Sequence, residues 1–253
     1  KGTHPIVLYD WQDSRRSDHP RKFLKTFSGT VVIDGYQVYH KLEKERENLK
    51  VAGCWIHARR PFADFIKSVG LTAAKGTNAQ EAYDMITEKL RIDNTFDDLP
   101  VSDCKKQRQL VLSEKVDAYF AWIKQKYIQV TPNGSIGKAL AYSINQEKYL
   151  RVFLTDGNIP MDNNYAEQAI RPFSLGRKNF VLIESSGGGI ASGVLYSLVE
   201  TAKANGLNTF EYFNLLLTEI PQHVYDNNLR FLDNLLPWAP LVQKACPSKY
   251  KKS

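Results

Sequence analysis

The feature that most constrains the fold is a change in the hydrophobic pattern near residue 60. Before it, short apolar runs alternate with amphipathic segments, which predicts strands at 5–9, 30–33 and 49–55 and helices at 19–27 and 36–47. Such alternation is typical of βαβ units with a partly parallel sheet. From about Pro61 to residue 155 the strand pattern is absent, and helical periodicity covers 78–91, 102–127 and 135–153. The sequence therefore predicts an α/β domain interrupted by an all-helical insertion.

Strand and helix patterns mix again after residue 155. We expect a helix at 162–173, a basic turn at 176–179, a strand at 180–183 and helices at 194–204 and 209–219. The glycines at 187–189 lack the Gly-Lys-Ser/Thr of a phosphate-binding loop and are interpreted as a flexible connection. The predicted organisation is a first part of the core at 1–60, the insertion at 61–155, a second part of the core at 156–206 and a helical C-terminal segment at 207–253.

The composition is that of an ordinary globular protein with a basic surface. The 253 residues include 34 Lys and Arg against 27 Asp and Glu, for a net charge of +7 and an isoelectric point near 9.1. This charge favours polyanionic partners such as DNA, although a solubilising surface has the same composition. No apolar run approaches the roughly 18 residues that span a bilayer, and three scattered cysteines form no disulfide framework. We therefore expect a cytoplasmic protein without a membrane partner.

A carboxylate stands at the end of the second predicted strand. Asp34 follows three β-branched residues and precedes Gly35, which lets the chain turn. Ligands of open α/β sheets bind at the carboxyl ends of strands, so Asp34 is a candidate catalytic or metal-binding residue. The alternative is an aspartate that only serves the turn, because Asp-Gly is a common turn pair.

A polar face is predicted on the helix that begins near Asp162, its expected N-cap. Asn163, Glu167 and Arg171 recur every four residues and would share this face. Glu167 is then a candidate oxygen ligand for Mg²⁺ or Mn²⁺, and Arg171 a candidate phosphate contact. The alternative is a capped helix with a Glu–Arg pair, worth about 0.2 to 0.5 kcal/mol.

A third motif, Cys54-Trp55-Ile56-His57-Ala58-Arg59-Arg60-Pro61-Phe62, follows the next predicted strand. Three other motifs accompany it along the chain: Asp34-Gly35-Tyr36 with Tyr39, the segment from Asp162 to Pro172, and Gly176-Arg177-Lys178-Asn179. Together and in this order they resemble the motifs of the insertion-sequence-66 family of bacterial transposases. The resemblance extends to residues 196–206 and covers nearly the whole chain. Each motif alone is weak, whereas the complete ordered set is specific.

The resemblance implies a ribonuclease-H-like core in which two aspartates and a glutamate hold two divalent metal ions. By motif matching, Asp34 is the second aspartate and Glu167 the glutamate, both catalytic and both ligands of Mg²⁺ or Mn²⁺. The helices of 61–155 would be the insertion of this core. Such metals activate the attacking water or 3′-hydroxyl and stabilise the leaving oxygen during phosphodiester cleavage and strand transfer.

The first aspartate of such a core has no clear counterpart in this sequence. Asp10 and Asp13 follow the first predicted strand, and neither has the expected context. We therefore expect an incomplete, N-terminally truncated catalytic domain that lacks its first strands and has weak or no activity by itself.

Other residues of the matched motifs are expected to support catalysis or to bind DNA. Supporting positions near the active site are His57, Asp162 and Asn163. The candidates for DNA-phosphate contacts, each with a solvated surface charge as its alternative, are Arg59, Arg60, Arg171, Arg177 and Lys178. Cys54 and His57 alone do not make a zinc site, because no second pair of ligands accompanies them.

The predicted function is that of a catalytic-domain fragment of a DNA transposase, a metal-dependent enzyme that cleaves and joins DNA strands. Its expected partners are transposon ends, target DNA, further copies of itself on DNA, and accessory transposition proteins. Two alternatives remain open. One is a noncatalytic DNA-binding or oligomerisation remnant of a truncated mobile element. The other is a ribonuclease-H-like nuclease with a different substrate.

Overall fold

Two parallel strands and the helix between them confirm the βαβ unit predicted near the N-terminus. The computed structural model describes residues 4–180 and 185–248. Strand β1 (Gly29–Ile33) pairs with β2 (Leu49–Gly53) from Gly29 opposite Leu49 to Ile33 opposite Gly53. Helix α2 (Gln37–Glu45) joins the strands, and the short helix α1 (Asp18–Phe23) precedes them. The mixed α/β class is therefore correct, in a chain that is mostly helical.

The two edges of this sheet differ in what covers them. The N–H of Val51, on the edge of β2 that faces away from β1, donates to Glu43 Oε1 at 2.9 Å. Lys148 Nζ lies 2.7 Å from the other oxygen of Glu43 and neutralises it. Within the described part of the chain, no strand pairs with the outer edge of β1.

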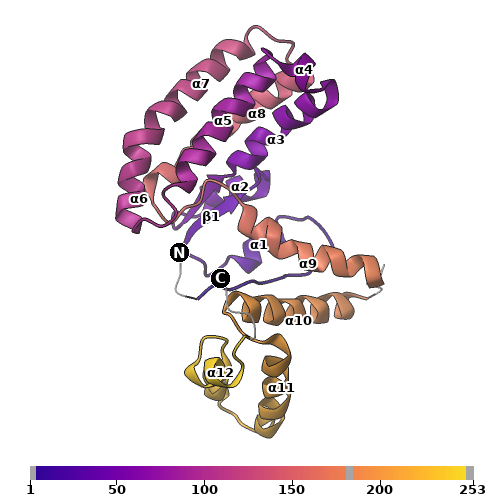
Figure 1. The fold of residues 1–253 in the computed structure, drawn as a ribbon. Coiled ribbons are helices and arrows are strands. Elements are labelled where there is room, and N and C mark those ends of the chain that lie inside the picture. The colour runs from indigo at the N-terminus through magenta and orange to yellow at the C-terminus, as the bar shows by residue number, and fades with distance from the viewer. Residues whose placement is uncertain (1–3, 181–184, 249–253) are drawn as a thin grey trace. The chain divides into compact units, whose positions relative to one another are not determined.

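A bundle of long helices follows β2 and is called the helical bundle below (Figure 1). Its elements are α3 (Trp55–Val69), α4 (Leu71–Ala74), α5 (Asn78–Asn94), α6 (Val101–Gln107), a π-helical turn (Arg108–Leu112), α7 (Ser113–Tyr127), α8 (Ser135–Leu150) and a 3₁₀ turn (Val152–Thr155). The predicted helices at 78–91 and 135–153 are confirmed, the latter ending in the 3₁₀ turn. The sequence did not predict that α3 begins directly after β2. No helix of the described residues is long and apolar enough to cross a membrane.

Trp55 joins the helical bundle to the end of β2. It is the first residue of α3 and is fully buried. Its indole Nε1 donates to the carbonyl oxygen of Leu150 at 2.8 Å, and its ring packs against Tyr119 and Phe153. A buried indole that satisfies its only donor contributes a large apolar area without a polar penalty.

The predicted helix at 102–127 is interrupted, because Arg108 is drawn into the interior by a buried ion pair. Its Nε and Nη2 donate to the two carboxylate oxygens of Asp93 at 2.7 and 2.9 Å. Its Nη1 lies within hydrogen-bonding distance of the carbonyl oxygens of Phe153, Asp156 and Ile159. The helix widens to a π-helical turn at this residue, as helices often do where a side chain has a special role.

Two compact units make up the chain: Ser17–Asn164 is the first, and Tyr165–Ser253 with Lys1–Arg16 is the second. The helices of the second unit are α9 (Asn164–Phe180), α10 (Ser186–Ala204), α11 (Thr209–Glu219) and α12 (Pro240–Ala245), with 3₁₀ turns at Ile220–His223 and Leu229–Leu235. The predicted basic turn at 176–179 is wrong, because α9 continues through it to Phe180. Of the strand predicted at 180–183, residue 180 ends this helix and the others lie outside the described residues.

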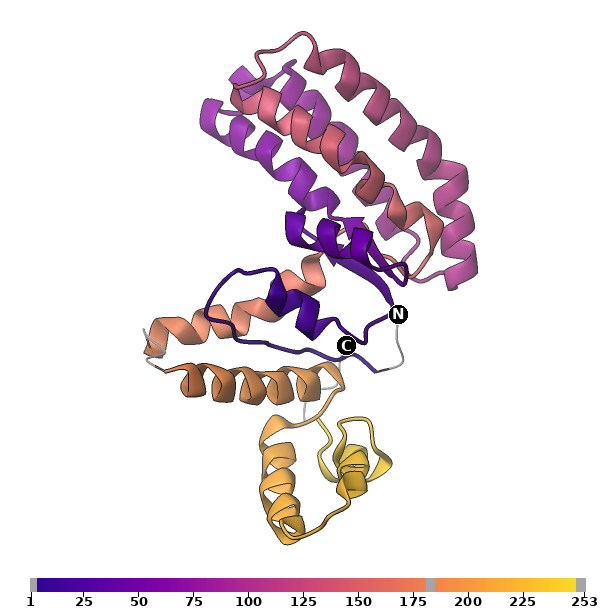
Figure 2. The same ribbon diagram turned by 180° about the vertical axis from the view of Figure 1, so that it is seen from behind.

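The predicted strand at 5–9 is also wrong: this segment is extended but pairs with a helix. It runs along α10 in both views of the fold (Figures 1 and 2). The N–H and C=O of Val7 both bond to Thr201 Oγ1 at 3.0 Å, and the N–H of Tyr9 donates to Ser197 Oγ at 2.9 Å. Side chains of α10 thus replace the neighbouring strand that an extended backbone otherwise needs.

The triple glycine lies inside α10 and is not the flexible connection that the sequence suggested. A Cβ atom at Gly189 would lie 2.5 Å from the ring of Trp11, and one at Gly193 would lie 3.0 Å from the carbonyl oxygen of Tyr9. With Ser197 and Thr201 these glycines recur every four residues and form one face of the helix. Their absent side chains allow the N-terminal segment to approach the helix backbone.

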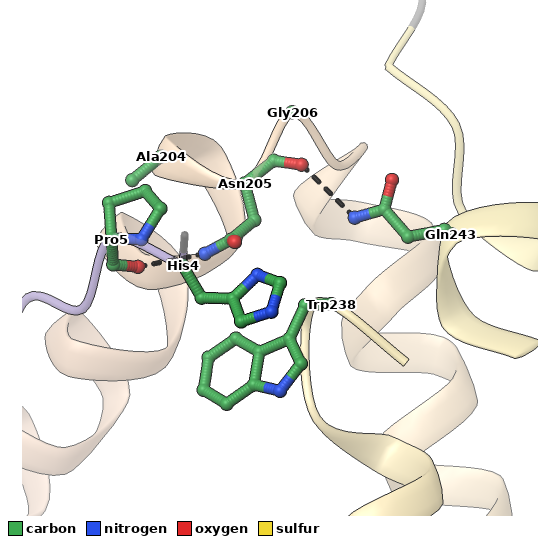
Figure 3. A pocket seen from close by; sticks show the side chains of 7 residues that line it. All are labelled: His4, Pro5, Ala204, Asn205, Gly206, Trp238 and Gln243. Carbon is green, nitrogen blue, oxygen red and sulfur yellow. Dashed lines mark hydrogen bonds between the residues drawn. The ribbon is translucent and has the colours of Figure 1, made fainter. Parts of the chain in front are cut away.

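The end of the chain forms a small core of its own around α11 and α12. Tyr212 is buried in it and donates its hydroxyl to the carbonyl oxygen of Leu235 at 2.9 Å. A pocket of about 420 Å³ lies between this core and the N-terminal segment, where His4 stacks on Trp238 at 5.0 Å (Figure 3). The side-chain amide of Asn205, at the end of α10, donates to the carbonyl oxygen of Pro5 and so links the N-terminal segment to this helix.

The glycine face of α10 generates a prediction with a matched control. We expect Gly189→Ala to destabilise the protein by about 1 to 3 kcal/mol, because the new methyl group would overlap the ring of Trp11. Gly187→Ala, in the same turn, meets no atom within 4 Å. It should instead be neutral or stabilise by up to about 1 kcal/mol through its better helix propensity. Urea unfolding of both variants measures the difference, and equal effects would contradict the packing described.

Lys89 generates a second prediction, because its ammonium group is buried among apolar residues. It is 1% exposed, donates to the carbonyl oxygen of Met85 and lies 4.9 Å from the ring centre of Tyr119. Burial lowers its pKa to about 8. The unfolded chain then binds more protons between pH 8 and its ordinary value near 10.5, so stability should rise with pH through this window.

Lys89→Met should therefore stabilise the protein at pH 7, by about 1 to 3 kcal/mol, since it removes a charge that is costly to bury. This gain should shrink above pH 8, where the wild-type lysine becomes neutral in the folded state. Chemical denaturation at pH 7 and pH 9.5 tests both statements. If Lys89→Met instead lowers the stability at pH 7, the stabilisation from the ammonium's contacts with Met85 and Tyr119 exceeds the cost of burying its charge.

Candidate functional site at the carboxyl ends of the strands

Asp34 lies in a tight turn directly after β1, and its side chain is exposed. Its Oδ1 accepts the N–H of Tyr36 at 3.1 Å, which closes the turn locally. Gly35 has a φ of +95°, a conformation that glycine adopts without strain. The exposed Asp34 carboxylate therefore lies at the carboxyl end of the strand.

Tyr142 of α8 reaches this turn from the helical bundle. Its hydroxyl donates to the backbone carbonyl oxygen of Asp34 at 2.9 Å, across 108 positions of sequence. Burial, with smaller contributions from the nearby Cys54 and Asp34 side chains, raises the pKa of Tyr142 to about 12. The hydroxyl therefore stays protonated near neutral pH and remains a hydrogen-bond donor.

Two of the sequence motifs meet at the end of β2. The N–H of Cys54 donates to the carbonyl oxygen of Ile33 at 3.0 Å and continues the ladder beyond the strand. Its Sγ accepts the N–H of Asn163 at 3.3 Å, and the N–H of Trp55 donates to Met161 O at 2.9 Å. Residues 161–163 are thus fixed beside the strand ends, although they follow Cys54 by more than a hundred positions.

Cys54 serves this junction as a neutral thiol. Burial raises the pKa of Cys54, against the backbone N–H groups of His57, Asn163 and Ile56, which favour the thiolate. A thiol that stays protonated is a poor metal ligand. Within the described residues, no group of three or more His, Cys, Asp or Glu side chains could hold a metal ion.

Asp162 hydrogen-bonds to the first residue of α9 but lies two positions before it, so it is not the N-cap that the sequence predicts. Its Oδ1 accepts the N–H of Asn164, and its Oδ2 accepts the side-chain amide of the same residue, each at 2.9 Å. The helix begins at Asn164, two residues later than expected. Asn163 therefore precedes the helix and does not share a regular helical face with Glu167 and Arg171.

Glu167 lies in the first turn of α9 and is half-buried. Arg171 follows one turn later and is exposed. Asp34 belongs to the unit of Ser17–Asn164 and Glu167 to the other unit. Their pairing at one metal site stays a prediction.

The remaining motif residues lie in three different environments. Arg59 is half-buried in the bundle, where it donates to Thr87 Oγ1 at 3.2 Å and lies over the ring of Tyr83. His57 is half-buried in the first turn of α3, and Arg60 is exposed on the same helix. The backbone of 177–178 belongs to α9, and the side chains of Arg177 and Lys178 lie outside the described residues.

Sequence patterns gave no sign of the two residues that shape this site from a distance. Tyr142 is one of 13 tyrosines and lies in an ordinary amphipathic helix. Arg108 looks like one more surface charge within a helical segment. Only Gly35 carries a local signal, because a glycine after a strand-ending aspartate indicates a turn.

Comparison with known proteins gives two family matches that together cover most of the chain. A family model described as "Transposase IS66 family" matches residues 1–191, and one described as "IS66 C-terminal element" matches residues 197–238. Among the curated relatives are two uncharacterized proteins of Sinorhizobium fredii, y4qI and y4jD, which are 31% and 28% identical to this chain. Each alignment covers 92% of this chain but only 43% and 45% of the relative. The chain thus spans less than half the length of these relatives. No solved structure matches it.

The contact between Gly35 and Tyr142 generates a testable prediction. A Cβ atom at Gly35 would lie 2.7 Å from the Tyr142 hydroxyl, whereas one at Gly70, which has a similar φ of +85°, meets nothing within 4 Å. Both alanine substitutions carry the cost of a positive φ, about 1 to 3 kcal/mol. We expect Gly35→Ala to cost about 1 to 3 kcal/mol more, from the overlap with Tyr142. Denaturant unfolding of the two variants gives this difference, which should be near zero if the ring does not pack on the turn.

Proposed function

Because this chain belongs to the IS66 family of transposases, we propose that it is part of the catalytic domain of an enzyme that cleaves and joins DNA strands. The chain spans less than half the length of its curated relatives, so the complete activity belongs to a longer protein. Asp34 and Glu167 are the proposed catalytic carboxylates. We propose that the third is an aspartate outside this chain, because neither Asp10 nor Asp13 has the expected sequence context.

The position of Asp34 is the observation that carries this proposal. The residue ends a strand of a parallel βαβ unit, where ligands of α/β sheets bind, and its carboxylate is exposed. The residues that lead into α9 are fixed at the same strand ends through Cys54 and Trp55. Glu167 follows them after one turn of that helix.

The proposed fold is a ribonuclease-H-like core, of which β1, β2 and α2 are a part. The outer edge of β2 is covered by Glu43, whereas no described strand pairs with the outer edge of β1. A central strand that carries the first aspartate would pair with β1 at this edge. The helical bundle would then be an insertion between the second aspartate and the glutamate.

The chemistry of the donor set suits Mg²⁺ or Mn²⁺, which prefer carboxylate oxygens and keep several waters. Asp34 and Glu167 would hold the metal together with the third carboxylate. When bound, a pair of such ions polarises the phosphate and favours the attacking and leaving oxygens. The protein's own contribution is to hold the carboxylates in place before the metal and DNA arrive.

DNA is the proposed partner, and the net charge of +7 favours it. Arg60 and Arg171, which are exposed, are the best placed of the predicted phosphate contacts. Arg59 would have to leave Thr87 and Tyr83 to reach a phosphate. Cutting and joining two transposon ends also calls for more than one copy of the enzyme, so we propose a homo-oligomer on DNA that works with accessory proteins in the bacterial cytoplasm.

The proposal predicts the effects of two conservative substitutions in the full-length protein. With Mn²⁺ and a DNA substrate that carries the transposon ends, Asp34→Asn and Glu167→Gln should each lower cleavage by about 1,000-fold or more, because each removes a charged metal ligand. DNA affinity at a fixed salt concentration should change less than about threefold, since neither residue is a cation. Gel-based cleavage and fluorescence anisotropy measure the two quantities.

Glu114→Gln removes an exposed carboxylate from α7 and serves as the control, with wild-type cleavage expected. Retained cleavage in either Asp34→Asn or Glu167→Gln would reject its assignment. Wild-type protein that binds DNA but never cleaves it, with either metal, would favour the noncatalytic alternative.

A further inference from the structure

We propose that Tyr142 is a positioning residue, which holds the turn after β1 so that the Asp34 carboxylate points toward the bound metal. This inference rests on the proposed function, because it assigns Asp34 to the metal. Tyr142 itself does not touch the metal or the DNA. It acts through one hydrogen bond to the backbone of Asp34 and through the packing of its ring on Gly35.

The turn has two restraints, and only one of them is local. The bond from the N–H of Tyr36 to Asp34 Oδ1 fixes the side chain relative to its own turn. The bond from Tyr142 Oη to the Asp34 carbonyl oxygen fixes the turn relative to a different element, α8. A metal ligand needs the second kind of restraint, because its partner ligands lie elsewhere in the chain.

Helix α8 is a rigid reference for this purpose. About two turns after Tyr142, the carbonyl oxygen of Leu150 accepts the indole N–H of Trp55. The backbone of α8 also approaches β2 closely, since a Cβ at Gly53 would lie 3.2 Å from the N atom of Leu150. The helix that carries Tyr142 is thus attached to the end of β2, next to the strand that carries Asp34.

The hydrogen bond is not required to satisfy a buried group. It lies at the exposed surface, where water could serve the Asp34 carbonyl equally well. Its net contribution to stability is therefore small, in the range of other exposed hydrogen bonds. A bond that adds little stability but crosses 108 positions to reach the turn of a metal ligand is better explained by positioning.

Tyr142→Phe in the full-length protein tests the inference, because it removes the hydroxyl and keeps the ring. We expect the Mn²⁺ concentration for half-maximal cleavage to rise about tenfold, with a maximal rate that changes less than about threefold. Direct Mn²⁺ binding, followed by electron paramagnetic resonance without DNA, should weaken by a similar factor. In the metal-free protein, amide exchange at 34–36 should speed up, since the turn has lost its anchor.

Tyr119→Phe is the matched control. It deletes a hydroxyl that bonds to Ser143, the neighbour of Tyr142 on α8, at 3.0 Å inside the bundle. It should leave the Mn²⁺ dependence and the exchange at 34–36 unchanged. Equal behaviour of the two variants would overturn the inference and leave Tyr142 a structural residue. Should Tyr142→Phe fail to fold, Gly35→Ala, which pushes the same ring away from the turn, is expected to shift the Mn²⁺ dependence in the same direction, and no shift would overturn the inference.

Asp34→Asn separates this inference from the proposed function. If Asp34→Asn abolishes cleavage and weakens Mn²⁺ binding while Tyr142→Phe behaves like its control, only the positioning role is lost. If Asp34→Asn leaves both intact, Asp34 is not a ligand and both proposals fail.

Discussion

The buried guanidinium of Arg108 is the interaction on which the rest of the first unit depends. A buried charge is tolerated only when all its hydrogen-bonding groups have partners. Two nitrogens of the Arg108 guanidinium donate to Asp93, and the third lies within hydrogen-bonding distance of three carbonyl oxygens of residues 153–159. Those carbonyls belong to the 3₁₀ turn and loop that leave the helical bundle, where no regular ladder would satisfy them. The guanidinium of Arg108 therefore neutralises the Asp93 carboxylate of α5, and it lies at the π-helical turn that interrupts the helix before α7. It also orders residues 153–159, which lead back from the bundle toward the strands.

From this segment, a chain of contacts leads to the candidate site. Met161 and Asn163 meet the backbone of Trp55 and the sulfur of Cys54, and Cys54 extends the ladder to Ile33, the residue before Asp34. Tyr142 provides a second connection to the turn after β1. Its helix, α8, is held at the end of β2 through Leu150, and its hydroxyl donates to the carbonyl oxygen of Asp34. The bundle is thus more than a spacer between two motifs. It supplies the buried indole, the ion pair and the hydroxyl that fix the strand ends, so a change deep in the bundle can alter the site without touching it.

The sequence predicted the elements whose signals are local and missed those that depend on distant partners. Hydrophobic runs ending in Asp34 and Cys54 identified both strands, and helical periodicity identified α5, α8 and α11. The N-terminal segment has the β-branched composition of a strand, yet its partner is α10, and no pattern within 5–9 could reveal that. The glycines at 187–189 looked flexible because glycine is permissive, whereas Gly189 is needed for the close approach of Trp11. Arg108 and Tyr142 were missed for the same reason: their roles exist only once distant segments are folded together.

The motif from Asp162 to Pro172 shows how one continuous string can serve two purposes. Its first residues are tied to the strand ends through Cys54, and Asp162 accepts the N–H of Asn164, the first residue of the helix that follows. Its later residues, Glu167 and Arg171, lie on that helix, which begins only at Asn164. The sequence suggested a single polar face, but Asn163 lies before the first residue of α9 and so does not extend the face of Glu167 and Arg171. The neutral, buried thiol of Cys54 therefore has a structural role here, because it accepts the backbone N–H of Asn163 and fixes this segment beside the strand ends.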